Sequence, residues 1–130
     1  LWGVTVLTSM APKDVKIFSP STGIPAMVKS LAKLGWVGGV DATICSPQEV
    51  GALKKSYPNL NMKFVTPGIR PKGAALNDQS RVMTPGQAAQ LGIDFIVIGR
   101  PITHALDPRK AALNILAEMK SAAPKSLERA

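Results

Sequence analysis

Residues 64–73 read FVTPGIRPKG: an apolar run stops at a Pro-Gly pair, and the cation Arg70 follows at once. A second stretch, DFIVIGRPIT at residues 94–103, repeats this order, with a glycine and then Arg100 at the end of an apolar run. Short apolar runs rich in β-branched residues are typical of buried strands. Two strand ends that each carry glycine and arginine indicate a site for an anion.

The apolar runs recur along the chain with a helical pattern between them. Four runs occur, at residues 2–8, 40–45, 62–66 and 94–99. They are nearly continuous rather than alternating, as parallel strands buried on both faces are. A helical pattern follows each run, at residues 23–35, 46–57, 84–92 and 107–123. This order predicts a parallel sheet with right-handed crossovers.

Capping residues mark the ends of these helices. Ser46 has Glu49 three positions on, and Thr84 has a glutamine at the same distance, so both fit a capping box. Asp107 stands before a proline as an N-cap. Gly35 is the predicted C-cap of the first helix after the opening strand.

The fold class follows from the four consecutive βα units. A doubly wound sheet and an eight-stranded βα barrel both accommodate them. No G-x-G-x-x-G follows the first strand, which disfavours a dinucleotide fold. We therefore predict an α/β fold, in which four βα units form half of a (β/α)8 TIM barrel. Long connections at residues 9–22 and 67–83 follow strand ends, where barrel enzymes keep their sites.

Composition narrows the class of protein further. The chain has 130 residues, 45% of them hydrophobic, enough for one modest domain or part of a larger one. A single cysteine excludes a disulfide framework and favours a cytoplasmic location. No apolar run reaches the length of a membrane span. The chain opens inside a strand pattern, so we expect it to be part of a larger protein.

The formal net charge of +8 raises the possibility of nucleic-acid binding. The Lys and Arg residues are scattered, however, and aromatic residues make up only 5% of the chain. No basic run alternates with rings on which bases could stack. We therefore expect no nucleic-acid partner, and the charge fits a chain whose remaining part is acidic.

The two strand ends supply the parts of a phosphate site. Barrels commonly bind phosphate with the loops after their last two strands. Gly68 and Gly99 let backbone N–H groups approach an oxyanion closely, while Arg70 and Arg100 each present a planar fork to phosphate oxygens. Gln79, on the loop between them, can donate from its amide. Either arginine alone is more often a solvated side chain, and their combination favours binding.

Other candidate residues carry weaker signals. The hydroxyls of Thr8 and Ser9 end the first strand and face the mouth of a barrel, where they cap a loop or bind a polar ring edge. Cys45 is expected to be a buried, inert thiol, because no histidine pairs with it. His104 follows the Arg100 loop and is interpreted as a surface side chain. No Cys/His cluster indicates a metal, and the carboxylates form no obvious acid–base pair.

Five motifs in register resemble one family over essentially the whole chain: VTVLTSM, CSPQEV, VTPGIRP, NDQSRVMTP and VIGRPIT followed by LDP. They resemble the bacterial type of orotidine 5'-phosphate decarboxylase, and specifically the C-terminal half of its barrel. The resemblance implies a carboxy-lyase that converts orotidine 5'-phosphate to UMP and CO2 in de novo pyrimidine biosynthesis. It implies no cofactor, no metal, a homodimer and a cytoplasmic location.

The same resemblance assigns roles to residues of this chain. Thr8 is expected to contact the polar edge of the pyrimidine, with Pro67 packed against the base and Ser9 assisting. The 5'-phosphate is expected to be held by Arg70, Gln79, Gly99 and Arg100. These assignments coincide with the phosphate site that the strand ends indicate.

One departure from the family is large. Its catalytic Asp/Lys/Asp-Lys-x-x-Asp constellation lies on early strands, and no such motif occurs in this chain. We therefore expect no catalytic residue here, and activity only when the N-terminal half of the barrel is supplied.

Alternatives stay open. One is a non-catalytic phosphate-binding half-barrel that assembles with itself. Others are a barrel decarboxylase or aldolase for another sugar phosphate and, more distantly, a nucleic-acid binder.

Overall fold

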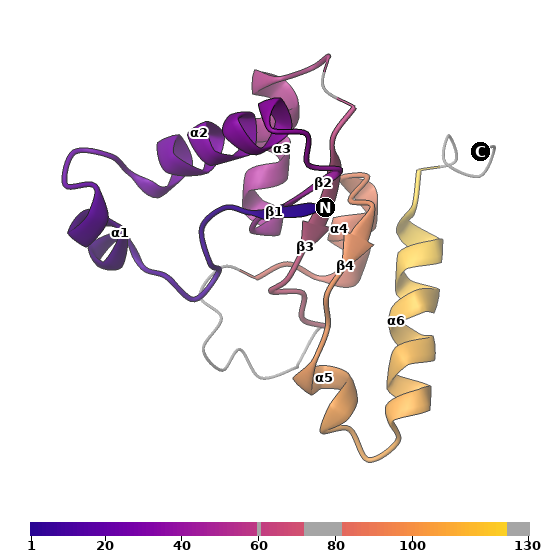
Figure 1. Cartoon of the computed structure of the whole chain (residues 1–130). Coiled ribbons are helices and arrows are strands. Elements are labelled where there is room, and N and C mark those ends of the chain that lie inside the picture. The colour runs from indigo at the N-terminus through magenta and orange to yellow at the C-terminus, as the bar shows by residue number, and fades with distance from the viewer. Residues whose placement is uncertain (60, 72–81, 125–130) are drawn as a thin grey trace.

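The computed structural model describes residues 1–59, 61–71 and 82–124, and over these residues the chain alternates strands with helices (Figure 1). The strands are β1 (Trp2–Val4), β2 (Ala42–Ile44), β3 (Lys63–Thr66) and β4 (Phe95–Ile96). The helices are α1 (Pro12–Phe18), α2 (Ile24–Val37), α3 (Pro47–Ser56), α4 (Pro85–Gln90), α5 (Arg100–Thr103) and α6 (Pro108–Ala122).

The strands form one sheet in the order β1-β2-β3-β4, and every neighbouring pair is parallel. Ile44 lies beside Val4 on one side and beside Val65 on the other, and Val65 lies beside Phe95. Spatial order equals chain order, so each crossover returns to the next position in the sheet. This arrangement confirms the predicted half of a (β/α)8 barrel.

The two faces of the sheet differ in how well they are covered. Ile96 and Ile98 line a cavity together with residues of α6, so their face carries helices. The opposite face presents Trp2, Val4, Phe95 and Val97, with exposed fractions of 54%, 55%, 46% and 50%. The rings of Trp2 and Phe95 stack there with centroids 6.0 Å apart. In a closed barrel this face is the interior.

The predicted helix starts are confirmed. The Ser46 hydroxyl accepts a hydrogen bond from the Gln48 amide at 3.4 Å, and the Glu49 carboxylate accepts one from the Ser46 amide at 3.0 Å. Thr84 and Gln87 exchange the equivalent pair at α4. The Asp107 carboxylate accepts from the Lys110 amide at 2.9 Å at α6. Side-chain caps therefore set where three of the helices begin.

The end of α2 corrects the prediction for Gly35. The helix continues through Gly35 to Val37, and its C-cap is Gly38. The residue with left-handed backbone is Gly39, at φ 83°, and this is the conformation that reverses the chain after a helix. Gly35 instead leaves room for Val40, whose Cγ2 would lie 3.3 Å from a Cβ at that position.

Two further differences concern extent. The strands are shorter than the predicted runs, and Thr8 and Ser9 lie beyond β1 instead of ending it. The connection at residues 9–22 contains α1, which the pattern missed because only Val15 of that helix is buried. Short α5 starts at Arg100, four residues after β4 ends at Ile96.

Candidate functional site

The two arginine motifs occupy equivalent places at the carboxyl end of the sheet. Thr66 of β3 lies beside Ile96 of β4, and the Val97 amide donates to the Thr66 carbonyl at 2.9 Å. Arg70 and Arg100 each follow this pair by four residues. Because parallel strands end at the same edge, both motifs emerge side by side.

A tight turn and a short bridge hold Arg70 in place. Gly68 has a φ of 77°, a left-handed conformation that glycine adopts without strain. Ile69, fully buried, then pairs in parallel with Met83. The Arg70 amide donates to the Met83 carbonyl at 2.9 Å, and the Met83 amide donates to the Gly68 carbonyl at 3.2 Å. We call these two hydrogen bonds the 68–83 clamp; it fixes the backbone on which Arg70 stands.

The Arg70 side chain is buried, with 7% of its surface exposed. Its Nη1 donates to the Ile69 carbonyl at 2.9 Å. Its Nε and the Thr66 Oγ1 find no hydrogen-bond partner within the part of the chain that the structure describes. A buried polar group without a partner costs free energy, and a buried charge costs more. An anion bound at this strand end would satisfy the guanidinium.

Arg100 begins α5, with exposed Gly99 as its N-cap. A Cβ built on Gly99 would meet nothing within 4 Å, so the space beside this residue is open. A cavity of about 250 Å³ lies nearby, lined by Pro71 and Pro101 together with Ala111, Asn114, Ile115 and Glu118 of α6. Pro71 follows Arg70 directly and Pro101 follows Arg100. One cavity therefore lies against the residue that follows each motif arginine.

The other residues that were predicted to contact the ligand lie outside the arginine motifs or at their edge. Thr8 is buried, with 5% exposed, and lies beyond β1 at the same end of the sheet, two strands away from β3. Gln79 lies outside the described residues. Pro67, in the turn before Gly68, is half-buried.

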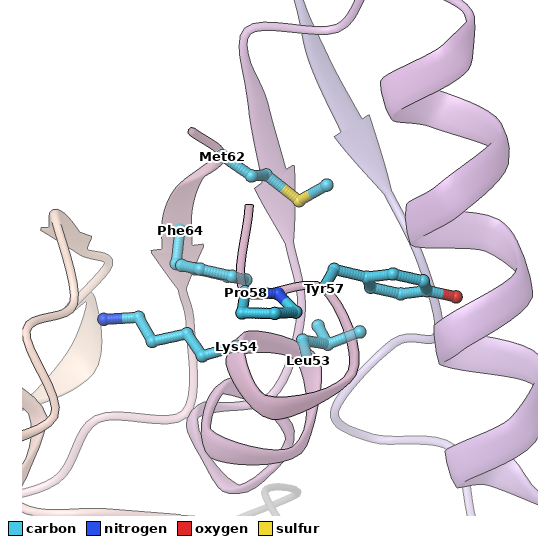
Figure 2. A pocket seen from close by; sticks show the side chains of 6 residues that line it. All are labelled: Leu53, Lys54, Tyr57, Pro58, Met62 and Phe64. Carbon is cyan, nitrogen blue, oxygen red and sulfur yellow. The ribbon is translucent and has the colours of Figure 1, made fainter. Parts of the chain in front are cut away.

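A second cavity, of about 320 Å³, lies at the other end of the strands (Figure 2). It is lined by Leu53, Lys54, Tyr57, Pro58, Met62 and Phe64, where α3 ends and β3 begins. Its cation is already engaged, since Lys54 Nζ donates to the carbonyls of Leu91 and Gly92 at 2.7 and 2.8 Å. Parallel α/β folds bind ligands at the carboxyl ends of their strands, so the candidate site is the edge that carries Arg70 and Arg100. The 250 Å³ cavity lies beside this edge, and among the described residues no predicted ligand residue lines it.

Titratable groups add little at this site. Cys45 is buried, as expected, and His104 is exposed at the end of α5. The described residues hold no group of three or more His, Cys, Asp or Glu side chains arranged to ligate a metal.

Two residues that lie next to Arg70 in the candidate site were not predicted from the sequence. Thr66, beside the turn to Arg70, has a hydroxyl that finds no partner among the described residues, and no sequence signal distinguishes it from an ordinary strand threonine. Met83 pairs with Ile69 across the loop; the only hint was its place just before the capping box at Thr84.

The fold and the arginines at its carboxyl end define the class: half of a (β/α)8 barrel of the kind that binds ligands beyond its strand ends. A family profile described as "Orotidine 5'-phosphate decarboxylase / HUMPS family" matches residues 1–115. The chain belongs to this family.

Individual relatives agree with the family. An orotidine 5'-phosphate decarboxylase of Pseudomonas aeruginosa is 48% identical over 119 residues, covering 92% of this chain and 50% of its own length. One of Opitutus terrae is 47% identical over 121 residues, covering 93% and 52%. The crystal structure of the Lactobacillus acidophilus orotidine 5'-phosphate decarboxylase superposes with a TM-score of 0.75 at 37% identity, covering 92% of this chain and 48% of that one. The chain thus spans about half the length of the relatives that it matches.

No described helix is long and apolar enough to cross a membrane.

Proposed function

We propose that this chain is the phosphate- and base-binding half of an orotidine 5'-phosphate decarboxylase. The whole protein would convert orotidine 5'-phosphate to UMP and CO2 in de novo pyrimidine biosynthesis, in the cytoplasm and as a homodimer. The observation that carries the proposal is the cavity lined by both Pro71 and Pro101, since each proline directly follows a motif arginine. The curated relatives at 47–48% identity support the choice of substrate.

Each residue then has a defined part in binding. Arg70 and Arg100 pair with the phosphate dianion, the open backbone at Gly99 lets its oxygens approach, and Gln79 donates from its amide. Thr8 donates to the polar edge of the pyrimidine. The phosphate lies away from the carbon that loses CO2, so its binding energy serves to position substrate and to organise the surrounding loops.

The chemical step falls to the other half of the barrel. When the carboxylate leaves as CO2, the bonding electron pair stays on the ring carbon, which must then take a proton. In the proposed assembly the family's lysine supplies this proton from the N-terminal half. Alone, the present chain would bind without turning over.

The partner of this chain is thus a set of four further βα units. The uncovered sheet face carries Trp2, Val4, Phe95 and Val97, and the outer helices present exposed Leu34 and Val37 on α2 and Leu113 and Leu116 on α6. Within the described residues, both outer strands also have a free edge, which natural proteins pair or cover. A net charge of +8 favours an acidic partner over a second copy.

Two other functions remain as competing proposals. A phosphate-binding half-barrel that pairs with itself would use the same apolar face and free edges, at the cost of bringing two chains of +8 together. A barrel enzyme for another sugar phosphate would share the arginine pair and would lack the pyrimidine contact at Thr8.

The test joins this chain to the amino-terminal half of the Pseudomonas aeruginosa relative, as one polypeptide. Loss of orotidine 5'-phosphate and formation of UMP are then followed. The chain alone and the amino-terminal half alone serve as controls. We expect turnover by the joined barrel only.

Each outcome has a distinct meaning. No turnover by a folded joined barrel that still binds UMP would contradict the assignment of the reaction. Turnover by the 130-residue chain alone would contradict the claim that the catalytic groups lie elsewhere. Binding of UMP by a stable dimer of the chain, with none by the joined barrel, would favour the self-assembling alternative.

A further inference from the structure

Glu118 of α6 reaches across to the start of another helix. Its Oε1 accepts a hydrogen bond from the Gly86 amide of α4 at 2.9 Å. A Cβ at Gly86 would lie 3.1 Å from that oxygen, so the glycine permits the approach. Glu118 also lines the 250 Å³ cavity beside Pro71 and Pro101. Glu118 therefore binds the helix start and lines the same cavity as the prolines that follow the two motif arginines.

The first amides of α4 show why this contact matters. Pro85 has no amide hydrogen, and the Gln87 amide is bound locally by Thr84. The Gly86 amide instead takes its acceptor from α6. Free amides at a helix start need an acceptor, and the positive end of the helix favours a carboxylate. Glu118 thus ties the beginning of α4 to α6, along which α4 packs (Figure 1).

The start of α4 is continuous with the 68–83 clamp. Met83 precedes the N-cap Thr84 directly, and its carbonyl and amide bond to Arg70 and Gly68. A shift of the helix start therefore moves Met83, and with it the backbone of Arg70. The chain of contacts runs from Glu118 through Gly86 and Met83 to Arg70, with a hydrogen bond or a short stretch of backbone at every step.

We infer that Glu118 is a positioning residue for the Arg70 side of the phosphate site, acting through the start of α4 and the 68–83 clamp. The inference rests on the proposed function, because it assumes that Arg70 binds the phosphate of the ligand. It adds a residue that acts on Arg70 through the backbone and that no strand-end motif contains.

The experiment uses the joined barrel and compares Glu118→Ala with Glu118→Gln, which keeps the acceptor oxygen. Two quantities are measured: hydrogen exchange at the Arg70 and Met83 amides, and the Kd for UMP. Loss of one hydrogen bond predicts about fivefold faster exchange and roughly fivefold weaker UMP binding for Glu118→Ala. Glu118→Gln is expected to restore both. Asp14→Ala is the matched control, since the Asp14 carboxylate accepts from the Ala11 amide at 2.8 Å on distant α1.

The outcomes separate the inference from the function on which it rests. If Glu118→Ala lowers only the melting temperature, as the control does, and leaves exchange or UMP affinity unchanged, the inference is overturned and the proposed function stands. If the unmodified barrel fails to bind UMP, the proposed function fails and takes the affinity claim with it. Faster exchange and weaker binding, both restored by glutamine, support the inference.

Discussion

Arg70 is a cation held in the interior of the protein with an incomplete set of partners. Its Nη1 has a backbone acceptor, while its Nε and the neighbouring Thr66 hydroxyl have none among the described residues. Such groups lower stability until a ligand satisfies them. Functional sites often carry this kind of cost, because the arrangement that binds the ligand differs from the most stable one.

A substitution at Arg70 separates these two effects. Arg70→Met keeps an unbranched side chain and removes the buried charge, so we expect the free energy of unfolding to rise by about 1 kcal/mol. UMP affinity is expected to fall by roughly 10- to 100-fold, as when a charged hydrogen bond is lost. Chemical unfolding and UMP titration of the joined barrel measure the two quantities.

The control for this prediction is Arg109→Met, at an exposed position on α6. It is expected to change neither quantity appreciably, because surface substitutions have small effects. A large loss of stability in Arg70→Met would show that the guanidinium supports the fold.

Sequence patterns predicted the site residues that directly follow strands. They did not predict the residues that act through tertiary contacts. Arg70 and Arg100 could be placed at one edge of the sheet because parallel strands bring their ends together; that they bind a phosphate stays a prediction. Thr66 and Glu118 could not be predicted, since their significance comes from burial and from a partner on another element.

The helices begin at side-chain caps and end where the backbone turns. Three starts followed directly from capping sequences, because the caps are local hydrogen bonds. The end of α2 did not, because Gly35, Gly38 and Gly39 all lie near it and the sequence does not distinguish which one takes the left-handed backbone. Helix α1 escaped notice because a single buried residue leaves no apolar periodicity.

Two glycine substitutions are expected to act in opposite directions. Gly39 has a φ of 83°, and a Cβ there would meet nothing within 4 Å, so only its backbone conformation opposes a side chain. Gly39→Ala should lower the free energy of unfolding by about 1 kcal/mol. Gly51 lies within α3 with equally open space, and Gly51→Ala should raise it by up to about 1 kcal/mol.

Urea unfolding of the two variants beside the parent measures both changes. Each substitution adds one methyl group to an open position, so differences in packing cancel. A rise in the free energy of unfolding for Gly39→Ala would contradict the assigned end of α2.

The sheet has one face that helices cover and one face that is exposed. Helices cover one face of the sheet, while the other face and both outer strands present apolar side chains and free backbone groups. The fold class was predictable because the alternation of strands and helices determines it. The exposed apolar face was predictable only after the motifs had placed the chain in one half of a barrel.

Trp2 reports on whether this face is covered. It is about half exposed on the open face, and coverage by a partner half should shift its fluorescence emission to shorter wavelength. The measurement uses Trp36→Phe, which leaves Trp2 as the remaining tryptophan of this chain, mixed with an amino-terminal half whose own tryptophans are replaced. The reciprocal Trp2→Phe variant reports Trp36 on α2 as a control. An unchanged Trp2 signal in an active complex would contradict the assigned interior face.

The stacked rings of Trp2 and Phe95 also limit the size of the side chains that a partner can place beside them. They come from the two outermost strands, and their centroids lie 6.0 Å apart. Two bulky rings at one level of a barrel leave little volume there, and barrel interiors are packed to the density of crystals. Any partner that closes this barrel must therefore bring small side chains to that level. A large residue there would keep the two halves apart even if every strand edge matched.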